Sequence, residues 1–279
     1  MDSNLVKKHI RSVVPRSARN WLRSPLKSAG WLVDGAAFSF GFTKAIDLTP
    51  DLRFICHPRA YKVYRDSQIG DPEQNSEFRA FLSYCSSSMF LYDIGAHFGI
   101  FSLTAARYGG KSLAVDPSPR ATRIIKIEAS LNQCADSIRI VCAAVGESNK
   151  MVEMVDSGVF SDGYFKSPAG RPVSELTRVQ SITIDDLTAR YGPPTHIKID
   201  VEGNEAAALK GANNTLGQYR PQLFIELHNE MVALEGGDPN SALDLLAAHG
   251  YVTISTSGKQ IGRAEILGRP IVRILAVHT

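Results

Sequence analysis

The sequence of 279 residues contains no long apolar run. A helix that crosses a membrane needs about 18 or more apolar residues in succession. The stretch that comes nearest, GWLVDGAAFSFGF at 30–42, is shorter than that and is interrupted by Asp34. The sequence therefore predicts that no segment of this chain spans a bilayer.

Cysteine is scarce, and its spacing is not that of a metal or disulfide site. No secretory signal is visible, and no C-x-x-C pair is formed by the four cysteines, Cys56, Cys85, Cys134 and Cys142. We therefore expect reduced thiols that act as packing residues in a cytoplasmic protein.

A large excess of charge is also missing, because the formal net charge is only +3. This value gives no argument for a nucleic-acid partner, and we expect none. The basic charge is concentrated in the first 30 residues, which hold Asp2 as their one acid and seven basic residues: Lys7, Lys8, Arg11, Arg16, Arg19, Arg23 and Lys27.

These basic residues alternate with Leu, Ile, Val and two tryptophans, and two interpretations stay open. The one we favour is a solvated basic arm, or short helices packed on the domain. The other is peripheral contact with an anionic membrane, or with an acidic partner, through an amphipathic helix. We assign residues 1–50 to this N-terminal arm and residues 51–279 to the main domain.

From residue 91 onward, apolar strand-like runs alternate with helical stretches such as 119–132 and 204–216, which is typical of a parallel α/β sheet. The expected strands are 91–94, 112–115, 138–143, 197–201 and 223–227, with extra pieces at 151–155 and 181–184. The last two runs, GYVTIST and RPIVRILAVHT, have a connection too short for a helical crossover, so we expect them to pair antiparallel.

The turn after the first strand, DIGAHFG at 93–99, lacks the fingerprint G-x-G-x-x-G of dinucleotide-binding folds. His97 and Ile100 stand where that pattern needs glycine. The turn has a carboxylate and no Lys or Arg, so a cationic ligand without phosphate, such as S-adenosylmethionine, fits it better than pyrophosphate. Asp116 ends the next strand, 21 positions after Gly95, where an acid can bind ribose hydroxyls.

Several stretches in this order resemble the FkbM family of S-adenosylmethionine-dependent methyltransferases, over roughly residues 57–279: YDIGAHFGIFSLTAARYGG, AVDPSP, AAVGE, SITIDDL, HIKIDVEGNEAAALKGA and PQLFIELH. The resemblance implies the class I methyltransferase fold, a Rossmann-like α/β sheet that is mostly parallel with an antiparallel last strand. It also implies O-methylation of a hydroxyl on a sugar, glycan or natural product, without naming the acceptor.

The resemblance further implies where the cofactor lies. Asp93, Gly95 and Gly99 would lie at its methionine end, Asp116 at the ribose, Ala144 and Val145 near the adenine, and Asp200 beside the transferred methyl group. The neighbours Ala96, His97, Pro117 and Ser118 are counted with these cofactor-binding residues. The alternatives from other classes are a dinucleotide-dependent oxidoreductase and a non-catalytic Rossmann-like binding module.

Two later strands carry polar residues that a buried parallel strand should lack. In HIKIDVEG, Lys198, Asp200 and Glu202 alternate with apolar residues, and in LFIELH, Glu226 and His228 share one side. If the strands are neighbours, their ends gather three carboxylates and an imidazole.

This group has three interpretations: a site that binds and deprotonates a substrate hydroxyl, a divalent metal site, or a structural polar network. We favour the first and assign no metal ligands. His228 is then the expected base and Glu202 the second choice. Asp200 positions cofactor and acceptor, and Glu226 orients His228 or the acceptor.

Two further segments are candidates for the acceptor side of the site. Residues 156–180 are rich in Gly, Ser and Pro and contain Phe160, Tyr164 and Phe165. This segment could be a lid whose aromatic side chains cover a sugar ring, or a mobile surface loop. Residues 51–90 would form the other wall, with Arg59, Tyr61 and Lys62 as acceptor contacts.

Overall fold

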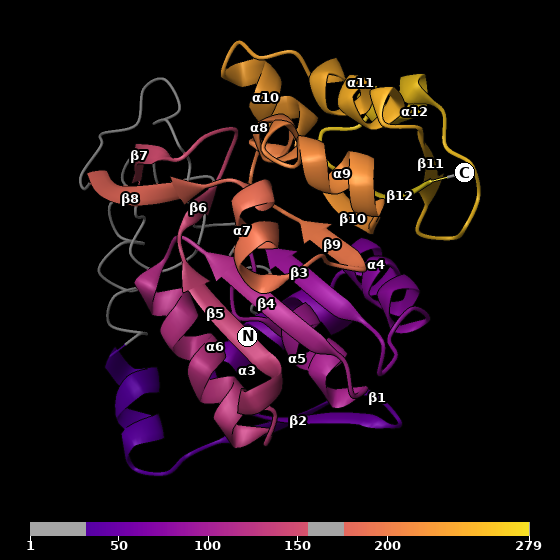
Figure 1. The fold of residues 1–279 in the computed structure, drawn as a ribbon. Helices are drawn as coiled ribbons and strands as arrows, with labels where there is room; N and C mark the ends of the chain where they lie inside the picture. Colours follow the sequence, from indigo (N-terminus) through magenta and orange to yellow (C-terminus); the bar gives the residue numbers. More distant parts are fainter. Residues whose placement is uncertain (1–31, 156–175, 279) are drawn as a thin grey trace, which may run out of the picture.

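A seven-stranded sheet forms the centre of the protein in the computed structural model, which describes residues 32–155 and 176–278 (Figure 1). In spatial order the strands are β11 (Tyr251–Ser255), β12 (Val272–His278), β10 (Gln222–Leu227), β9 (His196–Ile199), β3 (Phe90–Ile94), β4 (Lys111–Asp116) and β5 (Ile138–Cys142). Strands β10, β9, β3, β4 and β5 pair parallel, and β12 runs antiparallel to both of its neighbours. The predicted fold class is confirmed.

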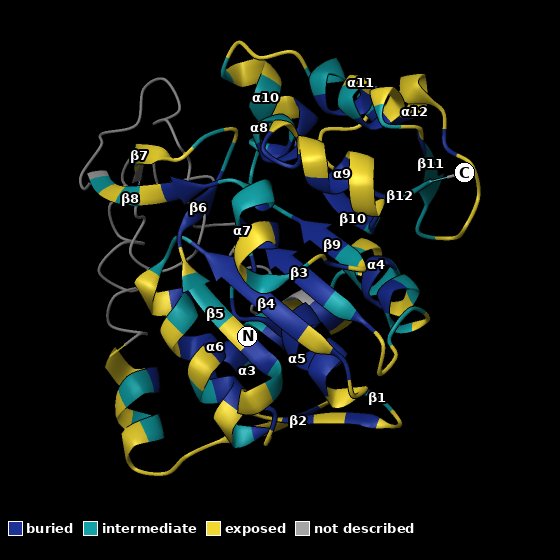
Figure 2. Ribbon diagram, in the orientation of Figure 1, coloured by how far each residue is buried: buried dark blue, intermediate teal, exposed yellow. Residues whose placement is uncertain are grey.

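Helices cover both faces of this sheet because the central strands are buried on both sides (Figure 2). On one face pack α3 (Pro58–Tyr64), α4 (Pro72–Leu82), α5 (Ile100–Arg107) and α6 (Pro119–Leu131). On the other face pack α7 (Ile184–Tyr191), α8 (Glu205–Lys210), α9 (Asn213–Tyr219), α11 (Asn240–Ala248) and α12 (Arg263–Leu267). Shorter elements connect them: the π-helical turn η1 (Arg65–Ile69), the 3-10 turn η2 (Ala135–Ser137) and α10 (Asn229–Leu234).

Most of the predicted elements occur, and their ends follow local chemistry. Helix α6 begins where Ser118 caps it by accepting a hydrogen bond from the Ala121 amide. The predicted helix 204–216 divides into α8 and α9 around Gly211, where a Cβ atom would lie 2.1 Å from the Gly146 carbonyl oxygen. The connection between β11 and β12 contains α12, yet the two strands pair antiparallel as expected.

The N-terminal part of the described chain consists of helix 32–39 and a hairpin of β1 (Lys44–Thr49) and β2 (Leu52–Cys56). The predicted boundary after residue 50 falls inside the turn of this hairpin. Ile46 of β1 is buried in the same hydrophobic cluster as Phe54 of β2. The side chain of Asn132, the residue that follows α6, accepts from the N–H of Ile55 and donates to its C=O, so the hairpin is fastened to the domain. The domain therefore extends back at least to Lys44.

A second sheet of three strands, β6 (Ala144–Val145), β8 (Leu176–Ile182) and β7 (Lys150–Val155), continues from β5. The predicted strand at 151–155 is confirmed. The predicted strand 181–184 is wrong in extent, because β8 ends at Ile182 and Thr183 caps α7 through a hydrogen bond from the Asp186 amide. Most of the predicted lid at 156–180, including Phe160, Tyr164 and Phe165, lies outside the described residues, and its last five residues belong to β8. The seven basic residues of the N-terminal arm also lie outside the described residues.

All four cysteines are unpaired. Cys56 and Cys134 are buried and Cys85 is half-buried, as expected for packing residues, whereas Cys142 is exposed. Among residues 32–155 and 176–278, no helix has both the length and the hydropathy that crossing a bilayer requires.

Candidate active site

A cavity of about 280 Å³ opens at the carboxyl ends of β3, β4, β9 and β10. This is the edge at which open α/β sheets bind their ligands. The opposite wall is formed by α3, η1 and α4 through Val63, Tyr64, Gln68, Gln74 and Glu77. Residues 51–90 thus supply the second wall, as expected.

The glycine turn after β3 is shaped by close approach to the end of β9. Gly95 has a φ of +77°, and a Cβ atom there would lie 1.8 Å from the Asp200 carbonyl oxygen. Gly99 has a φ of +79° and is the N-terminal cap of α5. The turn therefore needs glycine at 95 for both conformation and space, and this places the turn beside Asp200.

Two buried carboxyl groups hold the turn in place and line the cavity. Asp93 accepts hydrogen bonds from the Ser102 hydroxyl at 2.7 Å and the Ser102 amide at 3.1 Å, which ties β3 to α5. Asp116 accepts from the amides of Ser118 and His97, each at 2.8 Å. Burial raises the pKa of Asp93 to about 6 and that of Asp116 to about 7. Asp116 thereby connects the turns that follow β3 and β4.

The predicted cofactor residues gather around this cavity. It is lined by Asp93, Gly95, Ala96, His97, Asp116, Pro117, Ser118, Ala144, Val145 and Asp200. Gly99 does not line it but begins α5 behind the turn. Ala143, Ala144 and Val145 form an apolar wall on the side of β6.

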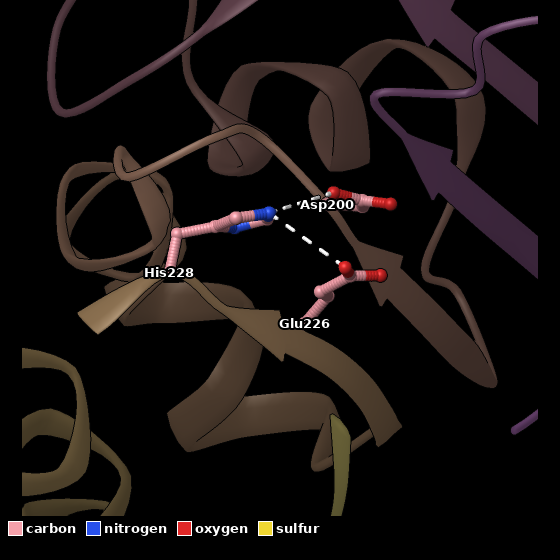
Figure 3. Close-up of side chains that lie close together, drawn as sticks. All are labelled: Asp200, Glu226 and His228. Atoms are coloured by element: carbon pink, nitrogen blue, oxygen red, sulfur yellow. Dashed lines mark ion pairs between the residues drawn. The ribbon is translucent and has the colours of Figure 1, made fainter. Parts of the chain in front are cut away.

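Strands β9 and β10 are neighbours, so the polar residues at their ends meet as expected. Figure 3 shows the His228 imidazole directed at Asp200 and Glu226, with Nε2 at 4.0 Å from Asp200 Oδ1 and 3.7 Å from Glu226 Oε1. Glu202 Oε2 lies 3.3 Å from the same nitrogen. Strand β9 ends at Ile199, two residues earlier than predicted, because Glu202 and Gly203 turn the chain with positive φ values.

The other imidazole nitrogen of His228 pairs with a residue that the sequence analysis missed. Nδ1 lies 2.9 Å from Oε1 of Glu205, a buried side chain at the start of α8. Glu205 stands in the stretch HIKIDVEGNE, three residues after Glu202, so the sequence shows that an acid is present there. The sequence does not show that this acid pairs with His228.

These carboxylates fix the protonation state of His228. Burial lowers the pKa of the imidazole, but the hydrogen bond and charge of Glu205, together with the charges of Asp200 and Glu202, raise it to about 9. His228 is therefore a cation at neutral pH, and both of its N–H groups face carboxylates. A general base must be unprotonated, and His228 is not on the cavity wall. The raised pKa of His228 and its place behind the cavity wall argue against the expected role as the base.

Two buried cations complete the cluster. Lys198 of β9 lies 3.2 Å from Glu77 of α4 and 3.6 Å from Asp200, and these charges raise its pKa despite burial. Arg273 of β12 binds both oxygens of Glu226, at 2.6 and 3.0 Å. Arg273 stands among the apolar residues of β12, Val272–His278, which is a signal the sequence analysis did not use. Nothing in the sequence of α4 distinguishes Glu77.

The same contacts bear on the metal interpretation. Asp200, Glu226 and His228 each offer an atom within 4.8 Å of the others. However, Arg273 occupies both oxygens of Glu226, and the His228 nitrogens face carboxylates. A metal would have to displace these protein cations, so the arrangement suits hydrogen bonding better than metal coordination.

The predicted acceptor contacts in α3 face elsewhere. Lys62 and Arg59 pair with Asp34 at 2.6 and 3.5 Å, and the Tyr61 ring contacts Lys44. Tyr64, on another side of the helix, lines the cavity and donates its hydroxyl to the Phe98 carbonyl at 2.6 Å. Helix α3 is thereby held against the glycine turn.

Comparison with known proteins decides the family. Residues 93–253, more than half of the chain, match the family model of the methyltransferase FkbM domain. The chain belongs to the FkbM methyltransferase family. S-adenosylmethionine is its cofactor, and the dinucleotide-dependent oxidoreductase and the passive binding module are set aside.

No curated protein matches the sequence, whereas many solved structures resemble its fold. An FkbM methyltransferase from Methylobacillus flagellatus KT is 18% identical, with a TM-score of 0.46 over 69% of this chain and 44% of that one. This chain thus spans less than half the length of that protein. An O-methyltransferase from Bacillus cereus in complex with SAH is 14% identical, with a TM-score of 0.44 over 99% and 97% of the two chains.

The cavity of this FkbM methyltransferase fits the chemistry of S-adenosylmethionine. The cofactor carries a sulfonium, an ammonium and one carboxylate, so its net charge is positive. Among the described residues, the cavity is lined by one lysine, Lys198, and by six acidic residues: Glu77, Asp93, Asp116, Asp200, Glu202 and Glu226. The apolar wall at 143–145 suits an adenine ring, and a carboxylate such as Asp116 suits ribose hydroxyls.

Proposed function

We propose that this FkbM methyltransferase methylates a hydroxyl oxygen of a sugar, glycan or similar polyol. The observation that carries the proposal is that one continuous cavity joins the glycine turn and Asp116 to the half-exposed carboxylates Asp200 and Glu202. Ionised carboxylates only accept hydrogen bonds, and hydroxyl groups donate them. The far end of the cavity therefore suits a neutral acceptor rich in hydroxyls.

Asp200 is the residue that we assign to the reacting hydroxyl. Its side chain is 32% exposed and lines the cavity. Burial raises its pKa, but the charges of Lys198, His228 and Arg273 outweigh burial and lower the pKa, so Asp200 is ionised at neutral pH. Its contacts to Lys198 and His228, at 3.6 and 4.0 Å, are longer than hydrogen bonds. The carboxylate can therefore accept a hydrogen bond from an incoming hydroxyl.

When bound, S-adenosylmethionine supplies an electrophilic methyl group. An alcohol is a weak nucleophile until its proton is being removed, and a placed base contributes about a hundred- to ten-thousand-fold in rate. As the bond between the hydroxyl oxygen and the methyl carbon forms, the oxygen becomes more acidic, and Asp200 takes its proton. His228 stays protonated and holds Glu202 in place through Nε2, at 3.3 Å.

The remaining acids have different roles in this proposal. Glu202 lies on a left-handed turn with φ of +51°, is one-third exposed and lines the cavity, so it orients an acceptor hydroxyl. Glu226 is held by Arg273 on both oxygens and shapes the wall between β10 and α4.

The class of reaction is tested by the linkage of the transferred methyl group. The purified protein is incubated with methyl-labelled S-adenosylmethionine and neutral hexose and deoxyhexose glycosides, with the matching uronic acids and amino sugars in parallel. We expect label in neutral glycosides, in a linkage that survives alkali as an ether does. Label found only in alkali-labile esters, or only on amines, would reject O-methylation of a hydroxyl.

A further inference from the structure

An apolar surface is formed by helix 32–39, which comes before the hairpin β1–β2 in the sequence, and by the turn that follows this helix. Leu32 is 76% exposed, Phe40 82% and Phe42 65%, and Val33 and Ala36 are exposed as well. Residues 32, 36 and 40 are spaced by four, so with Val33 they share one side of helix 32–39, and Phe42 follows directly. We call these five residues the outer face of helix 32–39. The helix is the unlabelled indigo helix at the lower left of Figure 1 and is coloured in yellow and teal in Figure 2.

The opposite side of the same helix is docked on the domain. Asp34 is buried and pairs with Lys62 at 2.6 Å and Arg59 at 3.5 Å, both from α3. The Phe38 ring contacts His57 at a centroid distance of 4.8 Å. The helix is thus held by a buried ion pair and a ring contact, and its outer face points away from the domain as a consequence of that docking.

Exposed aromatic and aliphatic side chains grouped along one helix and the turn that follows it are unusual on the surface of a globular domain and mark a contact surface. The charge of the neighbouring sequence indicates its partner. The first 30 residues, which lead directly into this helix, carry seven basic residues and one acid. A second copy of the chain would bring the same positive charge to the contact and be repelled, whereas an anionic lipid surface would be attracted.

We propose that the outer face of helix 32–39 docks this methyltransferase on an anionic lipid surface. The phenylalanines enter the boundary between headgroups and acyl chains, and the positive charge of the sequence before the helix favours lipids with anionic headgroups. The ion pair of Asp34 with Lys62 joins the docked helix to α3, whose Tyr64 lines the active-site cavity.

The test is sedimentation of the full-length protein with two kinds of vesicle: phosphatidylcholine mixed with phosphatidylglycerol in a two-to-one ratio, and phosphatidylcholine alone. We expect the wild type to bind the anionic vesicles and to be released as salt rises. The double variant Phe40→Gln, Phe42→Gln should bind them about tenfold or more weakly, because two buried aromatic side chains are removed from the lipid contact.

The matched control is Leu234→Gln with Ile271→Gln, which removes two exposed hydrophobic side chains elsewhere on the surface. It should bind the vesicles as the wild type does, and both variants should keep the wild-type affinity for S-adenosylhomocysteine. Three results would each overturn the proposal: a wild type that ignores anionic vesicles, a control that loses as much binding as the Phe40 and Phe42 variant, or a dimer in ultracentrifugation that this variant dissociates. Lower thermal stability of the variant with unchanged vesicle binding would also overturn it, because the face would then be covered by the chain itself.

Discussion

At the scale of single residues, the charge of His228 depends on how many carboxylates contact it. An imidazole beside one carboxylate can titrate near neutrality and act as a base. His228 instead faces Glu205, Glu202, Asp200 and Glu226, all within 4.0 Å, and is held as a cation. These contacts favour a positioning role for His228 over the role of base that the sequence led us to expect.

The raised pKa of His228 makes a prediction about stability. Its pKa rises from 6.5 to about 9 on folding, so its contribution is fully present below pH 6.5 and is lost as pH rises through 9. Replacement His228→Gln should lower the free energy of unfolding at pH 6.5 by on the order of 2 to 3 kcal/mol. The gap between the two proteins should close by about pH 10. Denaturant titrations at several pH values measure it, and a gap that widens with pH would show that His228 is neutral.

The proton-accepting role of Asp200 makes a second prediction. Asp200→Asn should lower turnover about a hundred- to ten-thousand-fold. It should also weaken binding of the cationic S-adenosylmethionine more than binding of the neutral S-adenosylhomocysteine, because only the former carries the sulfonium charge. The methyl-transfer assay and calorimetry measure these effects. Asp136→Asn, an exposed carboxylate in η2, is the control. Turnover within tenfold of the wild type would place the proton acceptor elsewhere.

The sequence alone could place the acids but not their partners. The alternation in HIKIDVEG and LFIELH put Asp200, Glu202, Glu226 and His228 at neighbouring strand ends, and they do meet there. Glu77 comes from α4 and Arg273 from β12, 121 and 75 positions away from Lys198, and no local pattern connects them. Because the protonation states depend on those partners, the chemical roles could not be assigned from sequence.

At the scale of elements, the turn between β3 and α5 is the part of the site with the least freedom. Strand alternation and glycine spacing predicted this turn, but not that its backbone touches the Asp200 carbonyl. That contact depends on β9 lying next to β3, although the paired residues Ile94 and Ile199 are 105 positions apart in the sequence. The turn and the end of β9 therefore act as one unit.

A glycine substitution tests this close approach. Gly95→Ala should lower the free energy of unfolding by about 3 kcal/mol or more, because it combines a positive φ with a collision at 1.8 Å, and S-adenosylhomocysteine binding should be lost. Gly236→Ala is the matched control, with a φ of +76° and nothing within 4 Å of the added atom. It should cost only about 1 to 2 kcal/mol and leave binding intact. Equal effects of both substitutions would mean that backbone conformation, not contact with β9, determines the turn.

At the scale of the whole molecule, distant parts of the chain meet in one buried charge network. Arg273 of the last strand binds Glu226 of β10 and lies 3.6 Å from Glu77 of α4, which pairs with Lys198 of β9. The antiparallel last strand, which the sequence predicted, thus does more than complete the sheet. It connects the floor of the cavity to the helical wall on the opposite side.

Breaking this network should be costly because it leaves buried carboxylates without a cation. Arg273→Met should lower the free energy of unfolding by about 3 to 5 kcal/mol, whereas Arg273→Lys, which keeps the charge but not the two-oxygen contact with Glu226, should lower it less. Chemical denaturation measures both. If Arg273→Met matches the wild type, the network does not stabilise the fold.

The central claim is that this cavity holds S-adenosylmethionine with Asp116 at the ribose. Calorimetry tests it most directly as a cycle: S-adenosylhomocysteine and its analogue without ribose hydroxyls, each titrated into the wild type and into Asp116→Asn. In the wild type, the analogue should bind about thirtyfold more weakly than S-adenosylhomocysteine, or about 2 kcal/mol, because it cannot make the charge-assisted contact with Asp116. In Asp116→Asn the two ligands should differ far less in affinity. Equal discrimination by both proteins, or no binding of S-adenosylhomocysteine by the wild type, would contradict the account.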